Sequence, residues 1–243
     1  ISTATYGVGT RGYITTSGIA SGVEKLTGIK VAVEPIAAEK SRFAAAKELK
    51  IDNALVLATA LGEALKGTGD FKEWGPQPIR QLYQGHWFHL VFYTAPRTGA
   101  KTWDDVRAKG LRVATLPADP SLEAHYNAII AAYDLKDKVK RVAFPNSTAS
   151  MDGVIEGTVD VALSGSGTTK VKEIQAAVGL VMLPAPDPAD TARWEKIRQF
   201  VPLAKPVELR KDYPGLPWDL MAAGYEKMWA WPETYYYIVW PQL

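Results

Sequence analysis

Two stretches with the same pattern, Asp52-Asn53-Ala54-Leu55 and Asp160-Val161-Ala162-Leu163, decide the predicted fold. Each follows a predicted helix and opens an apolar segment with the length of a buried strand. The same order of predicted elements precedes both: strand, loop, helix, strand, helix. Such alternation predicts a parallel sheet covered by helices. Its repetition predicts an α/β protein with two similar lobes, and one sheet of ten strands is the structural alternative.

The element boundaries follow from apolar runs and from the glycines and prolines between them. In the first half we expect strands at 3–8, 30–35 and 54–58 and helices at 16–26, 41–50 and 61–66. Strands at 79–83 and 90–94 follow, and residues 95–99 are predicted to cross between lobes. In the second half we expect helices at 103–109, 122–133, 148–156, 170–177 and 191–200, and strands at 112–116, 139–144, 159–163 and 180–183. Lobe I is then predicted to comprise residues 1–94 and 205–243, and lobe II residues 95–204.

Composition excludes several classes of function. The 243 residues carry 28 Lys and Arg against 26 Asp and Glu, a net charge of +2, which gives no field suited to nucleic acid or an anionic membrane. Cysteine is absent, which excludes disulfides, thiol catalysis and cysteine-ligated metal sites. No apolar run reaches the roughly 20 residues of a membrane-spanning helix. The chain opens directly into a predicted strand. A mature exported protein whose leader has been removed would begin in this way, and so would a shortened chain.

The first candidate site is the glycine-containing turn Gly7-Val8-Gly9-Thr10-Arg11-Gly12-Tyr13, at a strand exit that enters a helix. In open α/β sheets, ligands gather at this end of the strands. The glycine spacing departs from that of a dinucleotide site, so no cofactor is predicted. An anion held by helical N–H groups and by Arg11 is the functional interpretation, and a tight turn with an exposed arginine is the alternative.

The second half offers two comparable turns. Pro117, Asp119 and Ser121 lie between a predicted strand and helix, where helix capping and ligand contact are equally good interpretations. Ser164, Gly165 and Ser166 follow another strand and lack the lysine of a phosphate-binding loop, so a cleft wall or a turn is expected.

Enzymatic and metal chemistry find little support. His86 and His89 would point to opposite faces of a strand, and His125 lies on a distant helix, so no metal site is predicted. No Gly-x-Ser-x-Gly elbow or paired acid and base is present. The tryptophans and tyrosines concentrate at 86–93 and 218–240, where we expect core packing with a few rings lining a cleft. The chain is therefore predicted not to be an enzyme.

A family resemblance adds to this interpretation. The first loop at 9–13 is followed by Ser41-Arg42-Phe43 at the start of an alanine-rich helix and by the stretch at 50–56. The segments 102–114 and 152–162 complete the series, and their order resembles the TAXI family of solute-binding proteins, which serve TRAP-type transporters.

The resemblance implies an exported, periplasmic and monomeric protein that closes two lobes on a small organic acid and delivers it to TRAP membrane subunits. Glutamate, 2-oxoglutarate and related carboxylates are the ligands that it implies. It places Thr10, Arg11, Gly12, Tyr13, Ser41 and Thr59 on one side of the ligand, and Pro117, Asp119, Ser121, Ser164, Gly165 and Ser166 on the other. An ABC-transporter receptor for nitrate-, sulfonate- or thiamine-precursor-like ligands, an enzyme on the same scaffold and a sensory domain are the alternatives.

Overall fold

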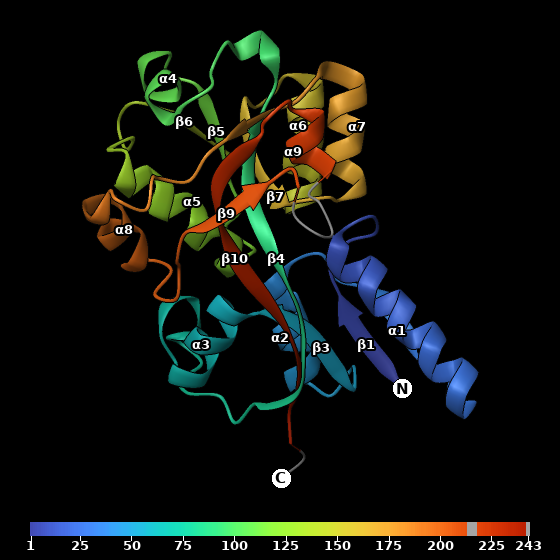
Figure 1. The fold of residues 1–243 in the computed structure, drawn as a ribbon. Helices are drawn as coiled ribbons and strands as arrows, with labels where there is room; N and C mark the ends of the chain where they lie inside the picture. The colour runs from blue at the N-terminus through green and yellow to red at the C-terminus, as the bar shows by residue number, and fades with distance from the viewer. Residues whose placement is uncertain (213–217, 242–243) are drawn as a thin grey trace. The chain divides into compact units, whose positions relative to one another are not determined.

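The computed structural model describes residues 1–212 and 218–241, without the side chains of His86, Trp87 and Trp218. The chain forms two compact units. Figure 1 shows its ribbon, coloured by residue number from the N-terminus to the C-terminus. Unit 1 comprises Ile1–Trp87, Ala118–Ser121 and Glu233–Leu243, and unit 2 comprises Phe88–Pro117 and Leu122–Pro232. The predicted crossing at 95–99 lies within unit 2, and the chain first passes between units at 87 and 88. The predicted lobe boundaries thus differ from those of the compact units, and they stay a prediction.

Unit 1 is built on three parallel strands and on parts of two longer strands. The strands are β1 (Ser2–Thr5), β2 (Ala32–Pro35) and β3 (Asn53–Leu57), with parts of β4 (Arg80–Thr94) and β10 (Lys227–Val239). The hydrogen-bonded order is β2-β1-β3-β10-β4, and β10 runs antiparallel to β3. Three α-helices, α1 (Arg11–Thr27), α2 (Glu39–Lys47) and α3 (Ala58–Lys66), and a short 3₁₀ helix, Gly69–Phe71, complete its regular elements. The carboxyl ends of β1 and β3 therefore meet at one edge of this unit.

Unit 2 repeats this arrangement. Its parallel strands are β5 (Arg112–Thr115), β6 (Lys140–Ala143) and β7 (Val161–Gly165), in the order β4-β7-β5-β6. The antiparallel strands are β4 beside β7, β8 (Val181–Leu183) beside β4, and β9 (Val207–Arg210) beside β10. Its helices are α4 (Trp103–Ala108), α5 (Pro120–Ala132, whose first two residues belong to unit 1), α6 (Ser147–Glu156), α7 (Thr169–Val178), α8 (Thr191–Arg198), α9 (Trp218–Ala222) and a 3₁₀ helix at Pro96–Thr98.

The repeated motif has the same structural role in both units. Asp52 precedes β3, and its Oδ2 accepts the backbone N–H of Ser2 in β1 at 2.6 Å. Asp160 precedes β7, and its Oδ2 accepts the backbone N–H of Arg112 in β5 at 2.9 Å. In each case a carboxylate joins the start of the third strand to the start of the first. The two halves therefore share a fold, as the motif predicted.

The ten strands belong to one hydrogen-bonded sheet: eight follow one another in its order, while β8 pairs with β4 and β9 pairs with β10 off that order. The number of strands thus agrees with the alternative of a ten-stranded sheet, and the two compact units agree with the predicted lobes. The strands predicted at 79–83 and 90–94 are one continuous strand, β4. Helix α1 begins at Arg11, five residues before its predicted start, because Thr10 caps it.

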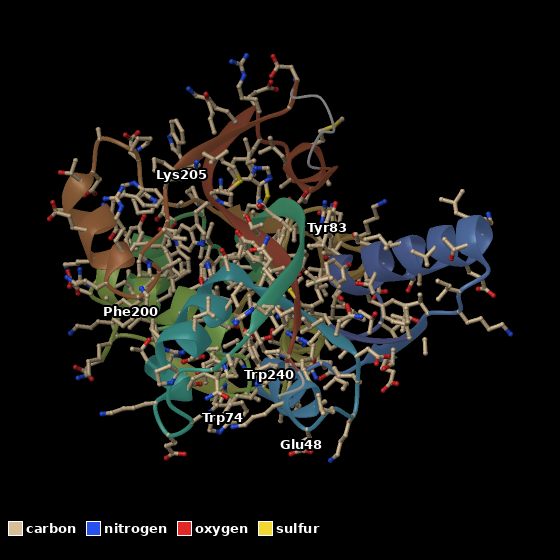
Figure 2. All side chains as sticks on the ribbon, turned by 90° about the horizontal axis from the view of Figure 1, so that it is seen from below. Glu48, Trp74, Tyr83, Phe200, Lys205 and Trp240 are labelled. Carbon is tan, nitrogen blue, oxygen red and sulfur yellow. The ribbon has the colours of Figure 1, made fainter. Side chains whose placement is uncertain are left out.

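Aromatic side chains fill the core of each unit. In unit 1, Phe43 packs edge-on against Phe71 with ring centroids 4.7 Å apart, and Trp74 and Trp240 pack against the same core (Figure 2). In unit 2, Phe92 packs against Trp103 at 4.9 Å and against Trp231 at 6.1 Å. Large rings bury much apolar area, and core packing accounts for part of the tryptophan and tyrosine content. Among the described residues, no helix is both long and apolar enough to cross a membrane.

Candidate functional site

The first turn of α1 is fixed by its own cap. The side chain of Thr10 accepts the N–H of Tyr13 at 3.2 Å and donates to the carbonyl of Gly7 at 2.7 Å. Gly12 is buried, and a Cβ there would lie 2.9 Å from Tyr6 Cδ2 and 3.0 Å from Leu55 Cδ2. Glycine at this position thus lets α1 approach the sheet closely.

Arg11 is half-buried beside Tyr235. Burial raises the pKa of Tyr235 well above its usual range, and the charges of Arg42 and Arg11 oppose that increase. The guanidinium of Arg11 therefore contributes positive potential at the carboxyl end of the unit 1 strands. Tyr13 is also half-buried, on the same turn.

Glu39 is the central carboxylate of unit 1. It is fully buried in the first turn of α2. Its Oε1 accepts the hydroxyl of Tyr6 at 2.8 Å and the N–H of Leu57 at 3.0 Å, and its Oε2 accepts the N–H of Ser121 at 3.2 Å. Leu57 and Ser121 lie at the starts of α3 and α5, the places where parallel α/β folds bind anions. The protein's own carboxylate therefore accepts N–H groups at the starts of two helices.

Arg42 balances the charge of Glu39. Its Nη2 lies 3.6 Å from Glu39 Oε1, and both side chains are completely buried. Its other nitrogens donate to the carbonyls of Leu55 at 2.9 Å, Ile36 at 2.7 Å and Ala37 at 2.9 Å. The guanidinium also lies 3.5 Å from the ring centroid of Tyr6, which adds a cation–π interaction.

A second buried carboxylate, Glu233 of β10, meets Thr59 of α3. Glu233 Oε1 accepts the hydroxyl of Thr59 at 2.8 Å and its N–H at 3.3 Å. Burial raises the pKa of Glu233 to about 7, the bonds from Thr59 oppose that increase, and the charge of Glu39 adds to it. Thr59 thus lies at the carboxyl end of β3, as predicted, and its polar groups contact a residue 174 positions away in the chain.

The segment containing Asp119 and Ser121 belongs to unit 1, whereas the prediction assigned it to the second lobe. Ser121 Oγ accepts the N–H of Ala60 at 3.0 Å, and Asp119 is buried close enough to raise the pKa of Tyr6, after the larger effects of burial and Glu39. Pro117, at the end of a unit 2 segment, is exposed.

The remaining predicted residues are not part of this group. Ser41 is exposed on α2, because the buried face of that helix carries Glu39, Arg42, Phe43 and Ala46 at helical spacing. Ser164, Gly165 and Ser166 belong to unit 2, where the N–H of Ser166 donates to the carbonyl of His89 at 2.8 Å. Their roles as ligand contacts stay predictions, as do those of the other predicted residues.

The histidines do not form a metal site among the described residues, which contain no group of three His, Cys, Asp or Glu side chains able to hold an ion. His125 is buried in α5, its ring stacked on Trp231 at 5.7 Å in unit 2. His89 is half-buried in β4, and the side chain of His86 lies outside the described residues.

Sequence reasoning did not include three charged residues of the unit 1 group among the site residues: Glu39, Arg42 and Glu233. Glu39 and Arg42 lie on either side of the predicted Ser41 in α2. The alanine-rich helix itself was predicted, but Ser41 was expected at the site, whereas the buried face of the helix carries Glu39 and Arg42. Glu233 is the one carboxylate in the strand Lys227–Val239, which is otherwise rich in aromatic residues. A lone acidic residue in such a strand was the available signal.

The sequence matches no known family model and no curated protein. Solved structures nevertheless resemble it in fold. Rpa4515 of R. palustris with adipate is 12% identical, with a TM-score of 0.60 over 97% of this chain and 75% of that one. MatC of Rhodopseudomonas palustris with bound malate is also 12% identical, with a TM-score of 0.60 over 97% and 77%. AbpA of Streptococcus pneumoniae, an amino acid ABC transporter substrate-binding protein bound to L-arginine, is 11% identical, with a TM-score of 0.51 over 83% and 87%. The chain thus has the two-lobe α/β fold of periplasmic binding proteins.

Proposed function

We propose that this chain is an exported, monomeric solute-binding protein that captures a small organic acid between two closing lobes and delivers it to a TRAP-type transporter. The observation that carries the proposal is the likeness in fold to binding proteins that hold adipate and malate, which extends over 97% of this chain. Both of those ligands are dicarboxylates. The residues that resemble the TAXI family add support for a TRAP rather than another transporter.

Within unit 1, we propose that Arg11 and the first turn of α1 hold a carboxylate of the ligand. Glu39 already accepts N–H groups at the starts of α3 and α5, and this leaves α1 as the helix start with a cationic side chain beside it. A guanidinium can bind a carboxylate through two charge-assisted hydrogen bonds. Thr10 and Gly12 position this turn through the cap and the close packing described above.

A ligand screen tests the proposal. Malate, adipate, 2-oxoglutarate and glutamate are added separately to the purified protein, and the melting temperature is recorded, because a ligand that binds the folded state alone raises it. At least one of these acids is expected to raise the melting temperature and to bind in calorimetry. Arg11→Ala is expected to weaken that binding by about 2–4 kcal/mol, and exposed Arg107→Ala serves as the matched control. The absence of binding by all four acids would contradict the proposed function.

An ABC-transporter receptor is the second candidate, because AbpA shares the fold at a TM-score of 0.51. The neighbouring genes separate the two candidates. A leader on the encoded precursor beside a large multi-span permease gene would favour TRAP transport, and a permease gene beside an ATPase gene would favour the ABC candidate.

A further inference from the structure

Glu233 lies at the place where ligands meet the strands of an α/β sheet. In the β10–β3 pairing, Tyr235 is opposite Leu57, so Glu233 lies beyond the carboxyl end of β3 and reaches the first turn of α3. Its carboxylate accepts two hydrogen bonds from Thr59, and the residue as a whole is 6% exposed. A buried acidic side chain is thus held at the edge of unit 1 where a solute is expected to bind.

The charge of Glu233 has no counter-charge among the described residues. In the part of the chain that the structure describes, no lysine or arginine forms an ion pair with it, whereas Glu39 is paired with Arg42 at 3.6 Å. Among the described residues, the charged group that acts on the pKa of Glu233 is the carboxylate of Glu39, and its effect is repulsive. Buried carboxylates are normally paired, because desolvating an unpaired charge is costly. Within the described part of the chain, no positive charge therefore balances Glu233.

We propose that Glu233 and Thr59 form a subsite for a protonated nitrogen of the solute, so that the ligand carries an ammonium group in addition to its carboxylate. The inference rests on the proposed function, which supplies a solute at this edge of unit 1. The ammonium supplies both the missing charge and hydrogen-bond donors for the carboxylate oxygens. Thr59 is a positioning residue, since its hydroxyl and N–H orient the carboxylate.

The subsite has a characteristic pH dependence. The groups that face Glu233 are Thr59 of α3, Thr234 of β10 and the carboxylate of Glu39 on α2. Burial raises the pKa of Glu233 to about 7. Below that pH the protonated side chain loses its charge, so affinity for an ammonium ligand is expected to fall with decreasing pH by up to tenfold per pH unit.

Matched pairs of probes that differ by one amino group test the subsite by calorimetry at pH 8 and pH 6. The pairs are L-glutamate with glutarate, L-aspartate with succinate, and L-norleucine with hexanoate. In at least one pair the amino compound is expected to bind ten times or more tightly than its partner. Glu233→Gln is expected to remove that preference and its pH dependence, while Glu63→Gln, which changes another carboxylate of unit 1, keeps both.

The outcomes separate this inference from the proposed function. Binding of acids without preference for the amino compounds, or a preference unchanged by Glu233→Gln, would overturn the subsite and leave the proposed function standing. If no compound of any pair binds and the four acids of the first screen fail as well, both are overturned. Circular dichroism of each variant confirms that it is folded before binding is measured.

Discussion

Replacing Glu39 by glutamine should strongly destabilise unit 1. The carboxylate accepts three hydrogen bonds and faces the buried guanidinium of Arg42 at 3.6 Å. A glutamine oxygen can keep the two bonds made by Oε1, but its NH₂ group then faces the N–H of Ser121, so one buried donor loses its acceptor. That loss costs about 1–3 kcal/mol. Removing the charge partner of a buried arginine costs about 3–5 kcal/mol.

These two costs overlap, because both arise from the same carboxylate, so the total is expected to be about 3–5 kcal/mol. The assay is urea unfolding followed by tryptophan fluorescence. With a slope of about 2–3 kcal/mol per M, the midpoint should fall by about 1–2.5 M. The matched control is Glu48→Gln on the exposed end of the same helix (Figure 2), which should change stability by less than about 0.5 kcal/mol.

Amide exchange locates the effect. The N–H groups of Leu57 and Ser121 donate to Glu39, so they should exchange faster in Glu39→Gln than in the wild type, while amides of α7 in unit 2 keep their rates. A midpoint for Glu39→Gln that equals that of Glu48→Gln would refute the assignment of Glu39 as the organising charge of unit 1.

Three further predictions follow from single contacts. Gly12→Ala should lower the free energy of unfolding by about 1–3 kcal/mol, because the added Cβ overpacks the contact between α1 and the sheet. The control Gly18→Ala, in open space on the same helix, should raise it by up to about 1 kcal/mol. Equal effects of the two substitutions in urea unfolding would contradict the close approach of α1. Asp160→Asn should cost about 1.5–3 kcal/mol, since Asp160 accepts two side-chain hydrogen bonds from Arg112 at 2.7 and 2.9 Å. Burial acts to raise the pKa of Asp160, but the bonds from Arg112 lower it overall, so the stability difference between the variant and the wild type should shrink as pH falls. An equal difference at pH 7 and pH 2 would argue against this role of the Arg112 pair. The pKa of Glu233 is about 7 in the folded state and about 4.5 in an unfolded chain, so the free energy of unfolding should fall as pH rises between those values. The free energy of unfolding of Glu233→Gln should match that of the wild type at pH 4 and exceed it by up to about 3 kcal/mol at pH 8. Parallel pH curves for the two proteins would refute the unpaired charge.

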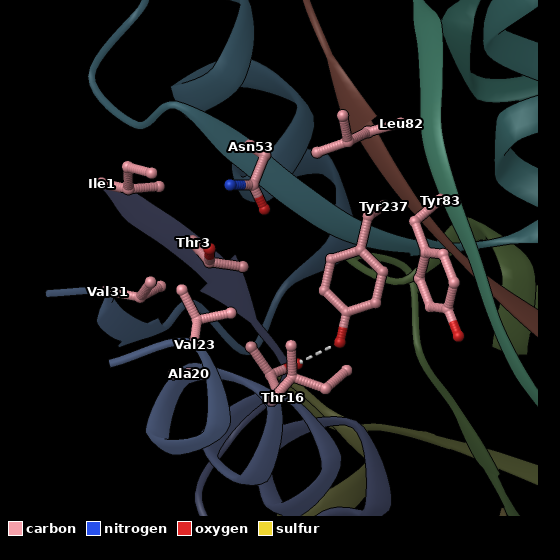
Figure 3. A pocket seen from close by; sticks show the side chains of 11 residues that line it. Ile1, Thr3, Thr16, Ala20, Val23, Val31, Asn53, Leu82, Tyr83 and Tyr237 are labelled. Atoms are coloured by element: carbon pink, nitrogen blue, oxygen red, sulfur yellow. Dashed lines mark hydrogen bonds between the residues drawn. The ribbon is translucent and has the colours of Figure 1, made fainter. Parts of the chain in front are cut away.

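The apolar pocket of unit 1 illustrates why a cavity alone does not identify a site. It has a volume of about 210 Å³ and lies between α1 and the strands, with Thr16, Tyr83 and Tyr237 among its lining residues (Figure 3). The hydroxyls of Thr16 and Tyr237 bond to each other at 2.9 Å, so these two groups are already satisfied. Its walls are otherwise mostly apolar. None of its lining residues has a charged side chain, in contrast to the edge that carries Arg11 and Glu233.

Local patterns predicted most of the fold. Short apolar strands separated by capped helices are encoded within a few residues, as Thr10 and Asn146 demonstrate by capping α1 and α6 through their own side chains. Strand β10 escaped prediction because Pro232 interrupts an aromatic run, and a proline usually argues against a strand. Its pairing with β3 is a contact between residues more than 170 positions apart, which no local pattern encodes.

The candidate site, like the fold, could be predicted only where local sequence patterns determine the position of a residue. Thr59 could be placed at the end of β3, because a strand followed by a helix fixes that position. The partner of Thr59 could not be, since Glu233 reaches it only through the pairing of β10. The same contact changes the chemistry expected of the ligand: a turn with Arg11 alone favours an additional carboxylate, whereas an unpaired buried carboxylate at the same edge favours a positive charge. A solute with both groups satisfies both residues, and one with only carboxylates leaves Glu233 to hold a proton.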